Sequence, residues 1–219
     1  MSDARTQILA RIRDATRDVP EGERPEDALV ERGYRVEDDA SRAEIVDRFA
    51  EYVAEYDATV HRVGADRLPG AIREALERRG VKSLVVPADV PQDWIPEGIE
   101  VLRDGANGGR LSNDDLDGSD GVLTGCAWGI AQTGTIVLDA GARQGRRAIT
   151  LLPDYHLCVV REDQILGLVP EVIRELESSV KGEGRAVTFI SGPSATADIE
   201  LERVQGVHGP RTLEVFIAG

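Results

Sequence analysis

The stretch that decides the fold class is residues 41–87, SRAEIVDRFAEYVAEYDATVHRVGADRLPGAIREALERRGVKSLVVP. Apolar residues recur at helical spacing along residues 45–56, and residues 58–63 follow as a short strand. A second helical pattern stops near Gly80, and residues 83–86 form an apolar run. Strands separated by helices of about a dozen residues need crossover connections. The stretch therefore predicts an α/β fold with a parallel sheet flanked by helices.

The chain before this stretch is expected to be peripheral. Apolar residues within 4–12 share one face of a first helix, and residues 20–25 form a charged linker. Ser41 and Glu44 then form a capping box, because the hydroxyl and the carboxylate can satisfy each other's free amides. We expect a single domain over residues 1–219, with residues 1–25 as a peripheral helix and linker.

The second half of the chain is expected to make the sheet mixed, though still mostly parallel. Residues 148–152 and 155–160 are separated by only two residues, which predicts an antiparallel hairpin. A short apolar helix is expected over residues 127–131, and a longer one over residues 163–180 that Pro170 opens or bends. The other expected strands are residues 98–102, 122–125, 134–139, 186–190 and 213–217.

Composition limits the classes of partner. The net charge is −14, and the basic residues are dispersed among more numerous acids, so no patch for a nucleic acid is expected. Apolar runs do not approach the roughly 20 residues that cross a bilayer, and the N-terminus does not resemble a signal peptide. A cytoplasmic location without membrane contact is expected. The acidic, arginine-biased composition fits a GC-rich genome or, alternatively, a high-salt cytoplasm.

Cofactor motifs are absent from the sequence. Cys126 and Cys158 have neither metal-ligand spacing nor the spacing of an iron–sulfur run, and both are expected to be buried thiols. The three histidines, His61, His156 and His208, are scattered, and no dinucleotide or Walker fingerprint occurs. We therefore expect no bound metal, flavin or cluster.

Loops rich in small residues are the candidate ligand-binding segments, and the first is residues 124–135. Small residues at a strand end let backbone amides approach an anion, although a tight packing joint without a ligand explains them equally simply. The residues proposed to bind a ligand here are Thr124, Gly125, Gln132, Thr133, Gly134 and Thr135.

Two further loops, residues 191–200 and 206–210, also lie beside expected strands. The first offers hydroxyls and amides at a strand end, where open α/β sheets bind ligands, although its Ser and Thr residues could instead cap a helical turn. His208 in the second could donate to an anion or act as an acid or base, but a lone histidine can also be structural. The candidate residues are Ser191, Gly192, Ser194, Thr196, Asp198, His208 and Gly209.

Arg146 is the expected clamp for a carboxylate or phosphate, with a solvated surface side chain as the alternative. We expect the three loops to converge at one end of the sheet. The ligand would then be a small anion, held by Ser194, Thr196 and His208 together with loop amides.

Taken in order, these loops resemble the lactate utilization protein C family, which is built on the LUD domain. The resemblance runs over residues 122–160 and 188–217 and includes Leu152-Pro153 with His156. It implies a fold like that of glucosamine-phosphate isomerases, ribose-phosphate isomerases and CoA transferases. It also implies a role in oxidation of L-lactate to pyruvate beside iron–sulfur subunits, with this chain as the cluster-free component.

Gln132 departs from the family, whose members often carry Asp or Glu at this position. A carboxylate there could act as base or nucleophile, as a glutamate does in CoA transferases, whereas an amide cannot. Two functions therefore remain open. The chain is an accessory component of lactate oxidation with a small-anion pocket, or it is a stand-alone enzyme acting on a phosphorylated or CoA-linked small molecule.

Overall fold

The computed structural model describes residues 3–20, 22–24, 33–106, 109–197, 203–205 and 209–219, and the side chains of 195–197 and 203–205 are not among the described parts. Two compact units divide the chain, Met1–Tyr34 and Arg35–Gly219. No described helix is long and apolar enough to cross a membrane. The helices are α1 (Ala4–Ala15), α2 (Arg42–Glu55), α3 (Leu68–Arg79), α4 (Asn113–Asp117) and α5 (Val169–Glu175).

The first unit contains α1, which begins after the N-cap Asp3 and has no buried residues. The structure divides the chain after Tyr34. The assignment of residues 1–25 as a peripheral helix and linker stays a prediction.

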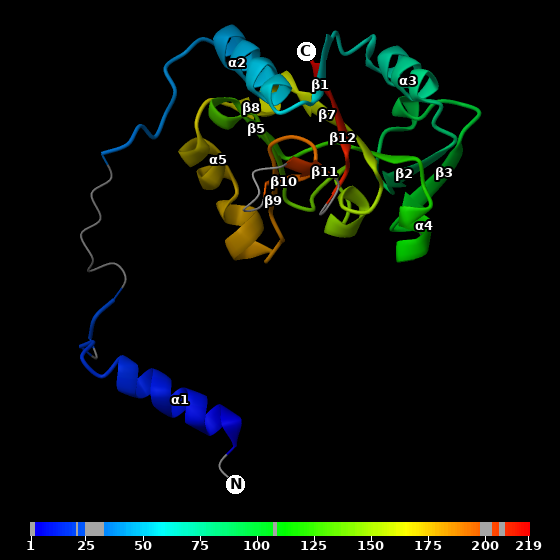
Figure 1. The fold of residues 1–219 in the computed structure, drawn as a ribbon. Helices are drawn as coiled ribbons and strands as arrows, with labels where there is room; N and C mark the ends of the chain where they lie inside the picture. The colour runs from blue at the N-terminus through cyan, green and yellow to red at the C-terminus, as the bar shows by residue number, and fades with distance from the viewer. Residues whose placement is uncertain (1–2, 21, 25–32, 107–108, 198–202, 206–208) are drawn as a thin grey trace. The chain divides into compact units, whose positions relative to one another are not determined.

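The second unit is built on a parallel six-stranded sheet, which confirms the predicted α/β class (Figure 1). Its neighbouring strands are parallel throughout. In spatial order they are β1 (Thr59–Val63), β12 (Thr212–Ala218), β7 (Tyr155–Arg161), β4 (Gly121–Thr124), β2 (Ser83–Pro87) and β3 (Glu100–Asp104).

A smaller mixed sheet makes the whole mostly rather than entirely parallel. In spatial order its strands are β8 (Ile165–Leu166), β5 (Trp128–Ile130), β6 (Thr135–Leu138) and β9 (Thr188–Ile190). Two short strands, β10 (Ala195–Ala197) and β11 (Arg203–Gln205), pair separately as an antiparallel hairpin.

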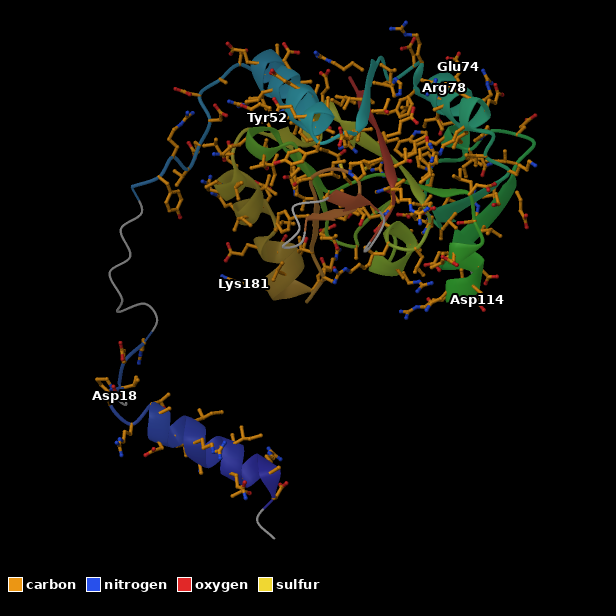
Figure 2. All side chains as sticks on the ribbon, in the orientation of Figure 1. Asp18, Tyr52, Glu74, Arg78, Asp114 and Lys181 are labelled. Atoms are coloured by element: carbon orange, nitrogen blue, oxygen red, sulfur yellow. The ribbon has the colours of Figure 1, made fainter. Side chains whose placement is uncertain are left out.

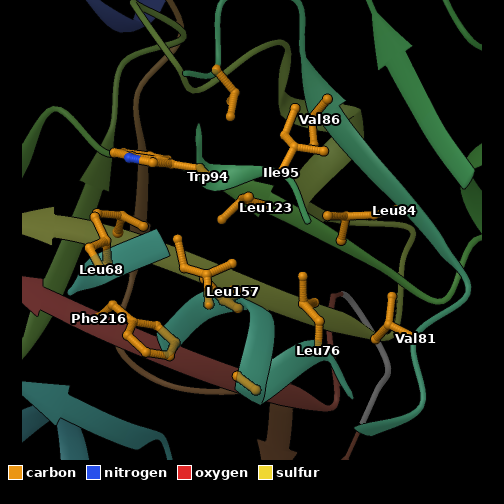
Figure 3. Close-up of a cluster of buried hydrophobic side chains, with 14 of the residues drawn as sticks. Leu68, Leu76, Val81, Leu84, Val86, Trp94, Ile95, Leu123, Leu157 and Phe216 are labelled. Carbon is orange, nitrogen blue, oxygen red and sulfur yellow. The ribbon is translucent and has the colours of Figure 1, made fainter. Parts of the chain in front are cut away.

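The two faces of the large sheet are covered differently, because side chains alternate along each strand. On one face, residues such as Leu84, Leu157 and Phe216 pack against α3 and Trp94 (Figure 3). On the other face, a second cluster joins strand residues such as Val215 to α2 and the small sheet. Charged side chains such as Glu74, Asp114 and Lys181 lie on the outside (Figure 2).

The capping box of α2 forms as predicted. The Ser41 hydroxyl accepts a hydrogen bond from the Glu44 amide, and the Glu44 carboxylate accepts one from the Ser41 amide at 2.8 Å. The helix buries Ile45, Val46 and Phe49, as its apolar spacing indicates. The start of this helix could be predicted correctly because the capping box is a local sequence signal with its own hydrogen bonds.

Two predicted elements are wrong. Residues 127–131 contain β5 rather than a helix, because Trp128 to Ile130 pair with β6 across a short turn. Residues 148–160 do not form a hairpin. Arg147–Thr150 is a 3₁₀ turn, and β7, buried except at Arg161, lies parallel between β12 and β4.

The helix expected over residues 163–180 is shorter than predicted. A 3₁₀ turn at Glu162–Gln164 and strand β8 precede it, so α5 begins at Val169, with Pro170 in its first turn. The chain continues after α5 into a π-helical turn at Ser178–Gly182. Pro170 therefore opens the helix, which is the first of its two predicted roles.

Candidate functional site

A cleft of about 330 Å³ lies at the amino ends of β7 and β12. The 3₁₀ turn before β7 forms one wall, and β9 with the loop after it forms another. The described residues that line it are Arg147, Thr150, Leu151, His156, Thr188, Phe189, Ile190, Ser191, Gly192, Pro193, Ser194, Gly209, Pro210 and Leu213.

The described ends of the second and third candidate loops, residues 191–194 and 209–210, meet at this cleft. The Ser194 amide donates a hydrogen bond of 2.7 Å to the Pro210 carbonyl, which ties the two segments together. Gly192 has a φ of +115°, and a Cβ there would lie 2.6 Å from the Cβ of Tyr56, so only glycine fits. Ser191, Gly192, Ser194 and Gly209 therefore lie close to one another.

Three predicted ligand-binding side chains cannot be placed. Asp198 and His208 lie outside the described residues, and only the backbone of Thr196 is described, in β10. Their roles in binding an anion therefore stay predictions.

The first candidate loop separates into two parts. The hydroxyl of Thr135 forms hydrogen bonds of 2.7 Å with the hydroxyls of Thr133 and Ser191. Thr135 therefore contacts the wall of the cleft at Ser191. Gly134 instead packs against α2, because a Cβ there would lie 2.5 Å from the carbonyl carbon of Tyr52. For Gly134 the structure favours the packing-joint interpretation.

Gln132 is exposed and lies against the turn before α5. Its backbone amide donates a hydrogen bond of 2.9 Å to the Gly167 carbonyl, and its side-chain oxygen accepts one of 3.4 Å from the Val169 backbone amide. These bonds give Gln132 a structural role in joining the turn after β5 to the segment before α5.

Thr124 and Gly125 lie at the carboxyl end of β4 and are not among the described residues that line the cleft. Thr124 is linked to the cleft through His156, which does line it. The Thr124 hydroxyl is 2.8 Å from Nε2 of His156, and both side chains are buried. Gly125 donates its amide to the Arg143 carbonyl at 2.8 Å. His156 was not among the candidate ligand-binding residues. A single histidine inside an otherwise apolar interior strand was the signal that could have identified it.

Arg146 binds a carboxylate of the protein itself rather than facing open space as a clamp for an anion would. Its guanidinium holds the buried Asp104 carboxylate with contacts of 3.0–3.2 Å and donates 2.7 Å to the Leu111 carbonyl. Arg147, the next residue, is exposed and lines the cleft. Within the described parts of the chain, no carboxylate forms an ion pair with Arg147. Arg147 is thus the cation without an ion pair among the described lining residues.

The charged side chain among the described lining residues of the cleft is basic, whereas the protein as a whole is acidic. Not one described lining residue is Asp or Glu, although the chain carries a net charge of −14. A second cavity of about 350 Å³ lies at the carboxyl ends of β2 and β3, and its wall combines Asp89 and Asp104 with Arg110 and Arg146. Open α/β sheets often bind ligands at that end. The described lining of the first cleft contains no acid, whereas that of the second contains two.

The two thiols lie in the hydrophobic core. Cys126 and Cys158 are buried and unpaired by a disulfide. A hydrogen bond with Cys158, together with burial, raises the pKa of Cys126 well above its usual value. Among the described residues no three His, Cys, Asp or Glu side chains gather in a way that could hold a metal ion.

Asp139 organises the loop between β6 and the cleft. Its carboxylate accepts bonds from the Gln144 side chain at 2.9 Å, the Gly141 amide at 3.0 Å and the Ser179 hydroxyl at 2.7 Å. Burial acts to raise its pKa, but these bonds and the charge of Arg185 outweigh it, so the pKa of Asp139 lies below its usual value.

Replacing this carboxylate is expected to give a pH-dependent loss of stability. At pH 7, Asp139→Asn should lower the free energy of unfolding by about 2 kcal/mol, because bonds to a charged acceptor are lost. The lowered pKa stabilises the fold above the unfolded-state pKa of about 4, and this contribution disappears as the pH falls through the folded-state pKa. Urea unfolding at several pH values should show the two proteins converging below about pH 4. A constant difference down to pH 2 would contradict this role.

Comparisons with known proteins agree with the fold. Residues 46–218 match the LUD domain family. Over its whole length the chain is 47% identical to Lactate utilization protein C of Deinococcus radiodurans, covering 97% of that protein. It is 30% identical to Lactate utilization protein C of Halalkalibacterium halodurans over 84% of this chain and 83% of the relative.

A solved structure gives the same result. The crystal structure of a duf162 family protein from Deinococcus radiodurans superposes with a TM-score of 0.71 at 45% identity, covering 82% of this chain and 99% of that one. The match to the family extends over most of the chain and includes every strand of the large sheet. The chain belongs to the LUD domain family.

Proposed function

We propose that this protein is a component of lactate utilization that binds a small carboxylate in the cleft at the amino ends of β7 and β12. The names of its relatives support the pathway, since two of them are Lactate utilization protein C. The observation that carries the site is the charge of the lining. In a strongly acidic protein, the described wall of this cleft contains Arg147 and no carboxylate.

The electrostatic reason is simple. An acidic protein repels anions over most of its surface, so an anion binds only where cations and hydrogen-bond donors are concentrated locally. The guanidinium of Arg147 offers a planar pair of donors that matches a carboxylate. Ser191 and Ser194 line the same cleft.

The remaining wall suits a small organic group. Leu151, Ile190 and Leu213 line the cleft together with Pro193 and Pro210. Ligand pockets in proteins begin at about 300 Å³, so this cleft is at the lower end of their range. A short carboxylic acid with a small alkyl group fits both its size and its mixed polar and apolar lining.

The proposal includes iron–sulfur subunits as partners, as the family resemblance implies, with this chain as the cluster-free component. Gene neighbourhood provides the first test. Adjacent genes encoding proteins with ferredoxin-type cysteine runs would support a multi-subunit system, and an isolated gene in several genomes would count against it.

Removing the Arg147 guanidinium should weaken binding of L-lactate by roughly tenfold or more, because a charge-assisted hydrogen bond is lost. Isothermal titration calorimetry on the whole protein and on Arg147→Ala measures this. Arg110→Ala is the matched control, since Arg110 is also exposed but lines the second cavity. Loss of binding in the Arg110 variant alone would move the ligand to that cavity and refute the proposed site.

A further inference from the structure

The second cavity, of about 350 Å³, shares no described lining residue with the cleft. It lies where β2 and β3 end, and its size is within the range of small-molecule pockets. Its charged lining residues are Asp89, Asp104, Arg110 and Arg146. The partners of these side chains decide which charges are left for a ligand.

Two of the charges neutralise each other within the wall. Nε of Arg146 lies 3.0 Å from Oδ2 of Asp104, and Nη2 of Arg146 lies 3.1 Å from Oδ1. The Leu111 amide donates a further hydrogen bond of 3.0 Å to this carboxylate, which is buried. The pair of Asp104 and Arg146 is therefore satisfied and adds no net charge to the cavity.

Asp89 and Arg110 remain, and both are exposed. Oδ2 of Asp89 accepts a hydrogen bond of 2.7 Å from the Arg143 amide, while the described residues provide no donor for its Oδ1. In the same part of the structure, Arg110 forms no ion pair, with Asp89 or with another acid. The cavity thus presents two opposite charges that do not neutralise each other.

A strained loop holds Asp89 in place. Ala140 has a φ of +55° and Arg143 a φ of +63°, in the left-handed region that side-chain-bearing residues rarely adopt. It is the amide of the strained Arg143 that binds the Asp89 carboxylate. Strain of this kind persists where the surrounding structure enforces it, commonly beside ligand sites. The carboxylate is therefore positioned before any ligand arrives.

The two separated charges select the class of ligand. A simple anion at Arg110 would share the cavity with the Asp89 carboxylate, and a simple cation at Asp89 would share it with the Arg110 guanidinium. A molecule that carries both an ammonium and a carboxylate group pairs with each of them through charge-assisted hydrogen bonds. The rest of the wall includes Pro87, Ala88 and Ala140, which leave room for a small organic group.

We propose that this cavity binds an α-amino acid as a zwitterion. The Arg110 guanidinium takes the carboxylate of the ligand, and Oδ1 of Asp89 takes its ammonium group. The site goes beyond the proposed function, because it lies apart from the carboxylate cleft and uses none of its described lining residues.

Isothermal titration calorimetry of the whole protein with each of the common amino acids tests the ligand class. At least one should bind, and the compounds that keep only one of its charges should bind roughly tenfold more weakly or less. For L-alanine these compounds are propanoate and ethylamine. If no amino acid binds, or if a compound with one charge binds equally well, the proposal is wrong.

Two substitutions test the position of the site. Asp89→Asn and Arg110→Ala should each weaken binding of the amino acid by roughly tenfold or more. The asparagine keeps an oxygen for the Arg143 amide, so the loop keeps its support. Asp93→Asn is the matched control, since Asp93 is exposed nearby in the sequence but does not line the cavity, and its affinity should equal that of wild type.

The outcomes distinguish this site from the carboxylate cleft. Unchanged affinity in both the Asp89 and the Arg110 variants would overturn the proposal, as would loss of amino-acid binding in Arg147→Ala alone. The same calorimetry with L-lactate tests the cleft separately, because Arg147 belongs to the cleft and Arg110 to the cavity.

Discussion

Gly134→Ala is expected to lower the free energy of unfolding by roughly 3 kcal/mol, since strain and a backbone collision add. Gly134 has a φ of +56°, a conformation that costs an alanine about 1–2 kcal/mol. A Cβ at this position would also lie 2.5 Å from the carbonyl carbon of Tyr52 and 2.7 Å from the Val53 amide nitrogen. These are backbone atoms of α2, so the helix or the turn must move. Urea unfolding measures the loss.

Gly80→Ala is the matched control for this prediction. Gly80 has a φ of +71° at the end of α3, and a Cβ there meets no atom within 4 Å. It should therefore cost only the conformational part, about 1–2 kcal/mol. Equal losses at the two positions would show that α2 does not pack against the turn as described.

Arg146→Ala is the second substitution with a large expected effect. Its partner Asp104 has a side chain only 5% exposed, and removing the guanidinium leaves that carboxylate buried and unpaired. Breaking a buried ion pair from one side costs about 3 kcal/mol or more. Thermal and urea unfolding should both show the loss, and Arg146→Ala with Asp104→Asn should recover part of it, because no uncompensated charge remains.

The adjacent arginine provides the contrast. Arg147→Ala should leave stability within about 0.5 kcal/mol of wild type, as at exposed positions without structural partners, while binding of L-lactate falls. Arg146→Ala should lose stability while the folded protein still binds. An Arg146 variant of normal stability that loses binding would return Arg146 to its predicted role as the anion clamp.

Much of the fold could be predicted because its signals are local. The α2 capping box uses residues three apart, and the apolar runs at β2 and β12 can each be recognised from consecutive residues. Residues 127–131 were misassigned to a helix because only their pairing with β6 makes them a strand. The predicted hairpin failed for a similar reason, since the partners of β7 lie distant in the sequence.

The site was less predictable than the fold. Small residues mark both a ligand loop and a packing joint, and Gly134 belongs to the second kind only because α2 lies against it. Arg146 and Arg147 are indistinguishable in the sequence. Asp104, 42 residues earlier, engages the first and leaves the second at the cleft. The position of His156 likewise depends on strand order, which places Thr124 beside it.

A crystal structure of the protein with L-lactate tests the central claim most directly. The account predicts electron density for the acid in the cleft at the amino ends of β7 and β12, with its carboxylate against the guanidinium of Arg147. Density in the second cavity, beside Asp89 and Arg110, or at another surface with this cleft empty would contradict it.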